Sequence, residues 1–267
     1  MEVCNESPSQ ESCLRTVVLV GLGNIGSHLA GLVARLGNVG RMILVDFDLY
    51  EPKNLSCQEI ASGEVGRSKV RVQARRLKRI NPGLHVEPIR ARVENLPLGR
   101  LRCDVIVAGL DSRAARQYVN QAAWRLGVSW IDAAVDAANL LARVNVYIRS
   151  RETPCLECAW DDTDYAALEQ QYPCRPAAVG AAATNAPAGL GAVAAGLSAI
   201  ECGKLLSGET QDLLAGRQVL INLRHHTHFV TSFRRNPACR FDQPRTRHPH
   251  AIGFGTAGAW RSLSAAV

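Results

Sequence analysis

Aromatic residues are scarce in this sequence, and none interrupts its densest basic stretch. Phe, Trp and Tyr make up 5% of the 267 residues. The basic stretch contains Arg67, Lys69, Arg71, Arg75, Arg76, Lys78 and Arg79. Proteins that bind single-stranded nucleic acid stack bases on aromatic side chains set among basic ones. We therefore expect no nucleic-acid partner despite a formal net charge of +7, and attribute the charge to a solvated helix face or an acidic protein partner.

The sequence also lacks the features of a membrane or secreted protein. No apolar run is expected to reach the roughly 20 residues of a bilayer-spanning helix. Residues 1–12 are polar and acidic, unlike a signal peptide. The nine cysteines are an odd number, which does not suggest a disulfide framework. We therefore expect a cytoplasmic protein without membrane contact, whose cysteines are reduced thiols, metal ligands or a nucleophile.

Length and composition predict one main domain. With 47% hydrophobic residues among 267, the chain can close one sizeable core. No internal repeat is present. We expect a single domain over 14–241, a flexible tail over 1–13, and a disordered tail over 242–267, which is rich in Pro, Arg, Gly and Ser.

The first half of the chain alternates short apolar strands with helices. We expect strands at 16–20, 42–46, 84–89, 105–108 and 128–132, and helices at 25–36, 65–80 and 112–126. Strands that alternate with helices of this length form a parallel sheet covered on both faces. We therefore predict an α/β, Rossmann-like, doubly wound and mostly parallel sheet, with a nucleotide-binding half at about 14–150.

The second half loses this alternation. Residues 140–148 alternate as a strand with one wetter face should. A long irregular crossover loop is expected over about 151–187, followed by a helix at 188–206 and strands at 219–222 and 229–233, which extend the sheet as antiparallel strands. Alternation along the last strand would place His226 and His228 on one face.

A glycine turn joins the first strand to the first helix. Gly21, Gly23 and Gly26 form the pattern Gly-x-Gly-x-x-Gly, which places backbone N–H groups and a helix N-terminus where a phosphate can bind. Asp46 ends the second strand, where a carboxylate can accept hydrogen bonds from a ribose. These residues fit NAD as readily as ATP.

Four segments after this turn resemble the ThiF/MoeB/ubiquitin-activating-enzyme superfamily of adenylate-forming enzymes in order and spacing. They are 46–55, 66–70, 79–82 and 109–112, and the resemblance covers roughly 17–206. It implies an ATP site, and the positions that match are Gly21, Gly23, Gly26, Asp46, Asp48, Asn54, Lys69 and Asp111. It further implies that Asp111 holds Mg²⁺ and that Lys69 and Asp111 are catalytic.

The chemistry of adenylate formation explains why a lysine and an aspartate would be needed at positions 69 and 111. Attack of a carboxylate on the α-phosphorus of ATP brings two anions together, so catalysis depends on charge neutralisation and alignment. Lys69 would offset charge on the polyphosphate, and Asp111 would hold a Mg²⁺ that bridges its oxygens. The alternatives are a solvated lysine and an aspartate that caps the helix after Ser112.

One position departs from the family pattern. The family carries Asn-Leu-x-Arg-Gln where this chain has Asn54-Leu55-Ser56-Cys57-Gln58. A thiol cannot make the bidentate contact that a guanidinium makes with phosphate. Lys53, Arg67, Arg71 or a partner's cation could substitute, or ATP turnover could be weak.

Three cysteines are candidates for a metal site. The family often holds a structural zinc between two Cys-x-x-Cys pairs, and Cys155, Cys158 and Cys239 match three of those ligands. The fourth ligand would be Asp242, a tail histidine such as His248, or absent. Unmetallated cysteines are the alternative.

A fourth cysteine, Cys174, lies in the expected crossover loop. Related enzymes keep a cysteine in this region that takes the activated acyl group. The neighbouring Arg175 would favour its thiolate. An incidental loop cysteine is the alternative.

The resemblance favours an ATP-dependent adenylyltransferase that activates the C-terminal carboxylate of a ubiquitin-like or sulfur-carrier protein, with possible thioester formation at Cys174, working as a homodimer. Activation of a peptide, small-molecule carboxylate or RNA carbonyl is a second hypothesis. A non-catalytic homologue that binds a nucleotide or partner is a third, favoured by Cys57. An NAD oxidoreductase is disfavoured because no catalytic domain follows the nucleotide-binding half.

Overall fold

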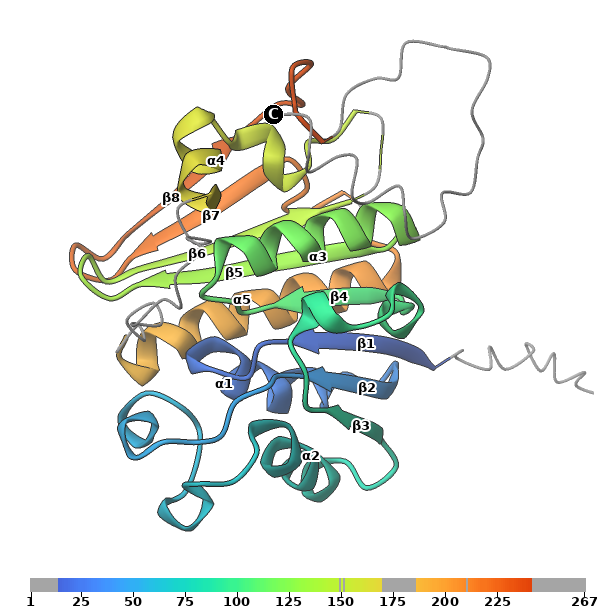
Figure 1. Ribbon diagram of the computed structural model, residues 1–267, viewed down its shortest axis with the longest axis vertical. Coiled ribbons are helices and arrows are strands. Elements are labelled where there is room, and N and C mark those ends of the chain that lie inside the picture. The colour runs from blue at the N-terminus through green and yellow to red at the C-terminus, as the bar shows by residue number, and fades with distance from the viewer. Residues whose placement is uncertain (1–13, 149, 151, 170–185, 210, 242–267) are drawn as a thin grey trace, which may run out of the picture.

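One eight-stranded sheet runs through the protein. The computed structural model describes residues 14–148, 150, 152–169, 186–209 and 211–241 (Figure 1). The strands are β1 (Arg15–Val20), β2 (Val39–Val45), β3 (His85–Ile89), β4 (Val105–Ala108), β5 (Ser129–Asp136), β6 (Leu141–Tyr147), β7 (Arg217–Asn222) and β8 (Thr227–Ser232). Their order is β3-β2-β1-β4-β5-β6-β7-β8. The first five are parallel, and β6, β7 and β8 each pair antiparallel. The predicted α/β class with antiparallel C-terminal strands is therefore confirmed.

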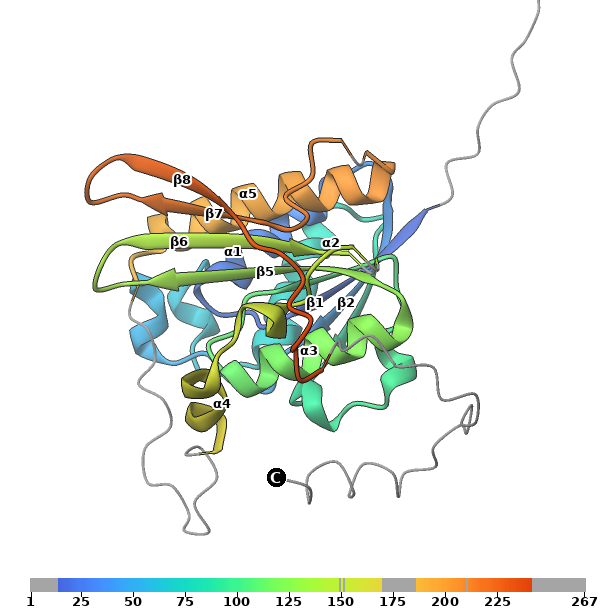
Figure 2. The same cartoon turned by 90° about the horizontal axis from the view of Figure 1, so that it is seen from above.

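Helices cover both faces of this sheet. They are α1 (Asn24–Val33), α2 (Lys69–Ile80), α3 (Arg113–Leu126), α4 (Asp162–Glu169) and α5 (Ala188–Ser207). The core under α1, α2 and α5 contains Val17 and Leu19 of β1, whereas the core under α3 contains Val18 and Val20. Alternate β1 residues therefore enter opposite cores, as the pleat requires. Figure 2 shows α3 and α5 on opposite sides of the sheet.

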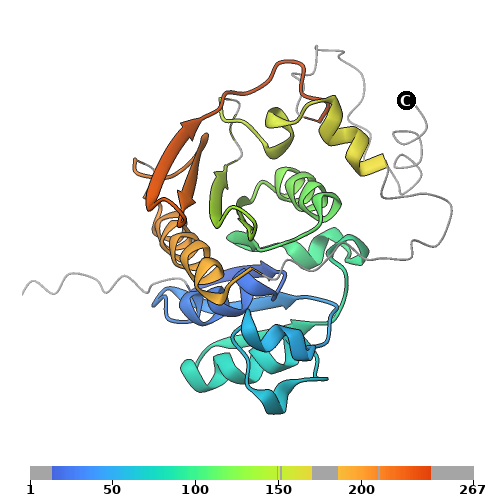
Figure 3. The same cartoon turned by 90° about the vertical axis from the view of Figure 1, so that its left-hand side faces the viewer.

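The two ends of the sheet carry different elements. α2 packs beside β3 at one end of the strand order, while β7 and β8 form the other. Figure 3 shows these ends far apart, with the region of α2 in cyan and teal and the last strands in orange and red. Every residue of β8 is exposed, including Phe229 and Val230.

Helix α5 corrects one expectation from the sequence. It has 20 residues, and an 18-residue window within it has a mean hydropathy of 1.3, so by length and composition α5 could cross a membrane. Half of that window is buried in the fold, where α5 packs against α1, β5 and β6. Its buried Glu201 accepts hydrogen bonds from Lys204 Nζ at 2.8 Å and the Leu214 backbone N–H at 2.9 Å. Packing in the core accounts for its apolar character.

Three local predictions differ from the structure. α2 begins at Lys69 rather than at residue 65, because Gly66 has a φ of +80° and Ser68 is extended. The expected loop over 151–187 contains α4 and a 3₁₀ turn, η5 (Leu156–Ala159). His226 has a φ of +53° and lies in the turn before β8, so it does not share a strand face with His228.

Candidate functional site

The segments predicted to bind a nucleotide meet at one edge of the sheet. Val45, Val20 and Ala108 are the last residues of β2, β1 and β4, and they are in register. The Gly21 N–H donates to Val45 O at 2.9 Å, and the Gly109 N–H donates to Val20 O at 3.0 Å. The glycine turn, the residues after β2 and the residues after β4 therefore lie side by side, as expected for the carboxyl end of a parallel sheet.

The glycine turn is closely packed at two of its three glycines. Gly21 has a φ of +85°, and a Cβ there would lie 2.6 Å from Gly109 O. A Cβ at Gly26 would lie 1.9 Å from Gly21 O. A Cβ at Gly23, which precedes α1, would meet nothing within 4 Å. The space beside Gly23 at the helix N-terminus is therefore open to a ligand, and this position suits a phosphate.

Asp46 is buried and holds the backbone around it. Its Oδ2 accepts from the Leu22 N–H at 2.7 Å, and its Oδ1 accepts from the Asp48 N–H at 2.8 Å. Desolvation by burial raises the pKa of Asp46, while the charge of Lys69 and these two N–H groups act against that rise. The carboxylate thus connects the glycine turn to the end of β2.

Lys69 lies at the start of α2 and is buried. Its Nζ is 2.9 Å from Oδ2 of Asp48, whose side chain is 43% exposed. Asn54 is buried nearby in η1 (Pro52–Ser56), where its Oδ1 accepts from the Glu51 N–H at 2.8 Å. The structure therefore places Lys69 with Asp48, and assigns Asn54 a local capping contact.

Asp111 lies beyond the end of β4. It is exposed, and its carboxylate makes no hydrogen bond or ion pair with any residue that the structure describes. The next residue, Ser112, caps α3 by accepting from the Ala115 N–H at 3.3 Å. The capping role considered for Asp111 thus belongs to Ser112, and the carboxylate of Asp111 remains available to a ligand.

Cys57 points into the protein. It is 4% exposed, and its Sγ lies 3.7 Å from Lys53 O and 3.8 Å from Asn54 O. Arg67 and Arg71, two of the cations considered as substitutes for the family arginine, are exposed. Lys53 is also exposed and pairs with Glu51 at 2.8 Å. The thiol is therefore a packing group.

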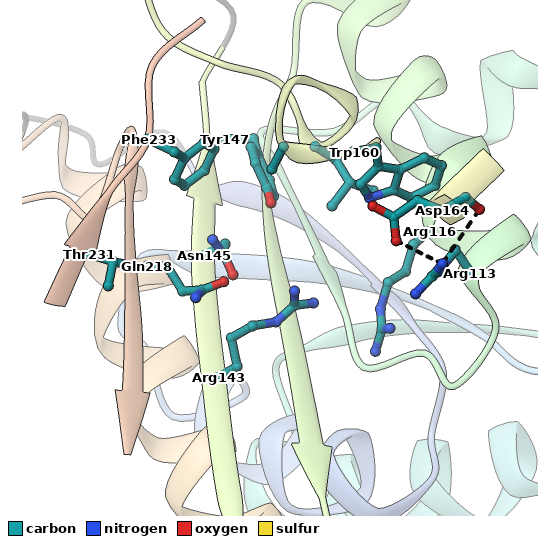
Figure 4. A pocket seen from close by; sticks show the side chains of 12 residues that line it. Arg113, Arg116, Arg143, Asn145, Tyr147, Trp160, Asp164, Gln218, Thr231 and Phe233 are labelled. Atoms are coloured by element: carbon teal, nitrogen blue, oxygen red, sulfur yellow. Dashed lines mark hydrogen bonds and ion pairs between the residues drawn. The ribbon is translucent and has the colours of Figure 1, made fainter. Parts of the chain in front are cut away.

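A cavity of about 350 Å³ lies beside this edge, over β6, β7 and β8 (Figure 4). Its walls include Arg143 and Asn145 of β6, Arg113 and Arg116 of α3, and Trp160. Arg143 and Asn145 are two residues apart and therefore share one face of β6. Asn145 is 2% exposed, and its Oδ1 has no hydrogen-bond partner among the described residues. The cavity therefore offers an unpaired amide oxygen, beside arginines that already pair with Asp164 and Asp132.

A fully buried carboxylate orients two of these arginines. Asp132 on β5 is 0% exposed, with Arg116 Nε 2.9 Å from its Oδ1 and Arg143 Nη2 2.5 Å from its Oδ2. Asp132 is in register with Ala108 of β4, so the cluster stands level with the glycine turn. Arg116 also donates to Leu110 O, next to Asp111. Sequence reasoning missed Asp132, although an acid inside an apolar strand was an available signal.

The cysteine cluster predicted from the sequence forms at η5. Cys155 Sγ lies 3.8 Å from both Cys158 Sγ and Cys239 Sγ, and all three sulfurs lie within 4.8 Å of one another. Zinc–sulfur bonds of about 2.3 Å in a tetrahedron place neighbouring sulfurs about 3.8 Å apart. Hydrogen bonds from the other two thiols lower the pKa of Cys158. The three residues therefore fit a zinc ion.

The remaining candidates lie outside the described residues. These are Cys174, and the two possible fourth zinc ligands, Asp242 and His248. The described ranges contain no fourth Cys, His, Asp or Glu in the cluster.

Sequence comparisons place these features among known proteins. The model of the ThiF family matches residues 8–241. Sulfur carrier protein ThiS adenylyltransferase of Escherichia coli strain K12 is 31% identical over 195 residues, which cover 72% of this chain and 72% of that protein. Ubiquitin-like modifier-activating enzyme 5 of Oryza sativa subsp. japonica is 27% identical over 159 residues, covering 54% of this chain and 37% of that protein. The chain thus spans less than half the length of that longer relative.

Structural comparison supports the fold. A crystal structure of E. coli MccB has a TM-score of 0.70 and 22% identity, covering 90% of this chain and 68% of MccB. E. coli MccB with ATP has a TM-score of 0.67 and 24% identity, covering 85% of this chain and 65% of MccB. At this identity the likeness shows the fold alone. Because the family model covers most of its residues, the chain belongs to the ThiF family.

Proposed function

We propose that this protein uses ATP to adenylate the C-terminal carboxylate of a ubiquitin-like or sulfur-carrier protein. One observation carries the proposal: two different half-sites lie on either side of the end of β4. The glycine turn, Asp46 and Lys69 lie on the β1 and β2 side, and the arginine-lined cavity lies on the β5 and β6 side. Asp111 stands between them.

The β1 and β2 side suits a nucleotide. The open space at Gly23 would take a phosphate, because a helix N-terminus presents unpaired N–H groups and a positive dipole end. Asp46 would accept ribose hydroxyls with its remaining lone pairs. Lys69, already held by Asp48, would also contact the polyphosphate. The exposed carboxylate of Asp111 would hold Mg²⁺, an ion that neutralises polyphosphate charge when bound.

The β5 and β6 side suits a carboxylate at the end of a peptide chain. Arg116 and Arg143 carry two positive charges against one on Asp132, so the cluster keeps a net charge of +1. Asn145 would pair with the peptide amide. Arg116 reaches Leu110 beside Asp111, so a carboxylate held there would face the nucleotide side.

The proposed adenylation forms one bond to phosphorus and breaks another. A carboxylate oxygen forms a bond to the α-phosphorus, the bond from that phosphorus to the bridging oxygen breaks, and pyrophosphate leaves with the electron pair. No proton transfer is required. The contributions of the protein are alignment and charge neutralisation, which are large when the groups are held in place beforehand.

We further propose that a structural zinc is held by Cys155, Cys158 and Cys239. It would tie η5 to the segment after β8. We also propose a homodimer in the cytoplasm, and the exposed Ile200 of α5 and Phe229 of β8 are apolar surface that a second copy could cover. The names of the relatives, an adenylyltransferase for sulfur carrier protein ThiS and a ubiquitin-like modifier-activating enzyme, support the choice of substrate class.

ATP–pyrophosphate exchange with and without candidate carrier proteins tests the adenylation. We expect exchange that depends on a carrier and on Mg²⁺. Asp111→Ala should abolish it, and Asp212→Asn, which changes another exposed carboxylate, should leave it intact. Exchange that persists in Asp111→Ala would contradict the Mg²⁺ role.

A thioester at Cys174 is a separate part of the proposal. A carrier treated with ATP should then become linked through a hydroxylamine-sensitive bond, and Cys174→Ala should remove the link while exchange continues. An adduct that survives Cys174→Ala would assign the acceptor to another residue.

The main alternative is a homologue that binds ATP without turnover. The burial of Cys57 favours it, because the position that carries the phosphate-binding arginine in the family here faces the interior. Thermal stabilisation by ATP with no exchange for any carrier would select this alternative. Larger stabilisation by NAD than by ATP would overturn both.

A further inference from the structure

Helix α2 carries a strongly basic outer surface. Six of its 12 residues are Arg or Lys, and none is Asp or Glu. Four of them, Arg71, Arg75, Lys78 and Arg79, are exposed. With 100° per residue, these four fall within one side of the helix. We call this side the basic face.

The arginines of the basic face differ from the other cations of α2 in that they form no ion pairs with the described acidic side chains. Lys69 contacts Asp48, and Arg76 pairs with Glu59. Within the described residues, Arg71, Arg75 and Arg79 make no ion pair with any acidic side chain. The chain thus neutralises the inward cations of α2 and leaves the outward ones unbalanced.

The stability of the fold does not require these unpaired positive charges on α2. Arg71, Arg75 and Arg79 follow one another at four-residue spacing, where like charges destabilise a helix. Cations near the helix C-terminus gain from the dipole, which accounts for Lys78 and Arg79. Arg71 lies in the first turn, where the same dipole disfavours a positive charge. A free basic face therefore weakens α2, and a bound anion would reverse that effect.

We propose that the basic face of α2 is a docking surface for an acidic segment of a partner protein. We choose an acidic partner because its negative charges would complement the positive charges of the basic face. Neighbouring members of the series Arg71, Arg75 and Arg79 lie about 6 Å apart along the helix axis. Acidic side chains one turn apart on a facing helix would have nearly the same spacing. No aromatic residue occurs in α2 to stack a base, so a protein fits this face better than a nucleic acid.

The position of α2 makes this surface independent of the arginine-lined cavity. α2 packs at the β3 end of the sheet, and the cavity lies over β6, β7 and β8. Five strands separate β3 from β7 in the strand order β3-β2-β1-β4-β5-β6-β7-β8. A partner held by the basic face would therefore leave the cavity free for another molecule.

The test uses a fluorescein-labelled helical peptide with Glu at every fourth position. A peptide of the same composition with its Glu residues clustered at one end is the spacing control. Anisotropy at about 150 mM salt, where the Debye length is near 8 Å, should show tighter binding of the spaced peptide. Arg71→Glu with Arg75→Glu should weaken it by about tenfold or more.

A matched double variant separates this face from overall charge. Arg102→Glu with Arg224→Glu changes net charge equally at exposed sites outside α2, and should weaken binding by about twofold or less. Arg75→Glu should also raise Tm of the free protein, since it removes repulsion from Arg71 and Arg79. Equal losses in both double variants, no preference for the spaced peptide, or tighter binding of single-stranded oligonucleotides would overturn the proposal.

Discussion

Lys69 Nζ lies 2.9 Å from Asp48 Oδ2, with the lysine buried and the aspartate half-exposed. The pair stands beside Asp46, because Asp46 accepts the backbone N–H of Asp48. A lysine held this way loses little side-chain freedom when a second anion arrives. Under the proposed function, the pair would hold Lys69 in place beside Asp46 before ATP binds.

Replacing Lys69 should therefore impair adenylation more than replacing a neighbouring exposed lysine. We expect Lys69→Ala to lower pyrophosphate exchange on the order of 10²-fold, the usual effect of removing one preorganised charge-stabilising group. Lys53→Ala, near the same site but exposed, should retain most activity. Exchange assays on both variants check this. A larger loss in Lys53→Ala would assign the phosphate contact to Lys53.

Asp46 should give the protein a pH-dependent stability. Burial raises its pKa in the folded state above the ordinary value of 3.8. The folded state therefore binds the proton more strongly than the unfolded state. The stability from this group is present below the unfolded pKa and is lost as pH rises through the folded pKa.

The variant Asp46→Asn has no carboxyl group at this position, so it does not lose stability in this way as pH rises. Its Tm relative to the wild type should thus shift upward as pH rises from about 4 to 7, even if the lost acceptor lowers Tm by a constant amount. Calorimetric melting across that range measures the shift. A Tm difference that is constant, or that moves downward, would contradict a raised pKa. The variant should also lose stabilisation by ATP.

The cysteine cluster should contain metal. Purified protein is expected to hold about one equivalent of zinc, and Cys158→Ser should lose it together with stability of the segment after β8. Cys202→Ser, a buried cysteine of α5 outside the cluster, is the control that should keep its zinc. Metal analysis and melting experiments measure both. Fully folded, metal-free wild-type protein would make the three cysteines packing residues.

Asp132 should be far more important to stability than an exposed acid with a similar partner. Asp132→Asn leaves Arg116 and Arg143 without their buried counter-charge, and should lower the free energy of unfolding by about 3–5 kcal/mol. Asp104→Asn, which affects the exposed pair with Arg15 at 3.1 Å, should cost about 1 kcal/mol or less. Denaturant titrations compare the two. Similar losses would mean that Asp132 is hydrated.

The parallel half of the fold follows from local sequence patterns. β4 begins and ends where its apolar run does, at Val105 and Ala108. Periodicity places a helix boundary less well, since α2 starts only after the positive φ of Gly66. Helix α4 was missed because its signal is a short capping pattern, in which Asp161 accepts from the Thr163 and Asp164 N–H groups. Proline content nearby had suggested a loop.

The meeting of the predicted nucleotide-binding segments at one edge of the sheet was predictable from the sequence, whereas the cavity was not. Gly21, Asp46 and Asp111 lie in segments whose order resembles a known family. Asp132, Arg116 and Arg143 come from two strands and a helix, and their contacts depend on the register of β5 with β6. Such a cluster depends on tertiary packing, and the contacts of tertiary packing cannot be read directly from a single sequence.

Asn24 joins three distant parts of the chain at the glycine turn. Its Nδ2 donates to Cys57 O and Ala186 O, each at 2.8 Å. A Cβ at Gly191 would lie 1.9 Å from Asn24 Oδ1, so the first turn of α5 is pressed against the same side chain. A movement of any one of these segments would break a buried hydrogen bond of Asn24 unless the others moved with it. The glycine turn, the residue after η1 and the entry to α5 should therefore move as one unit.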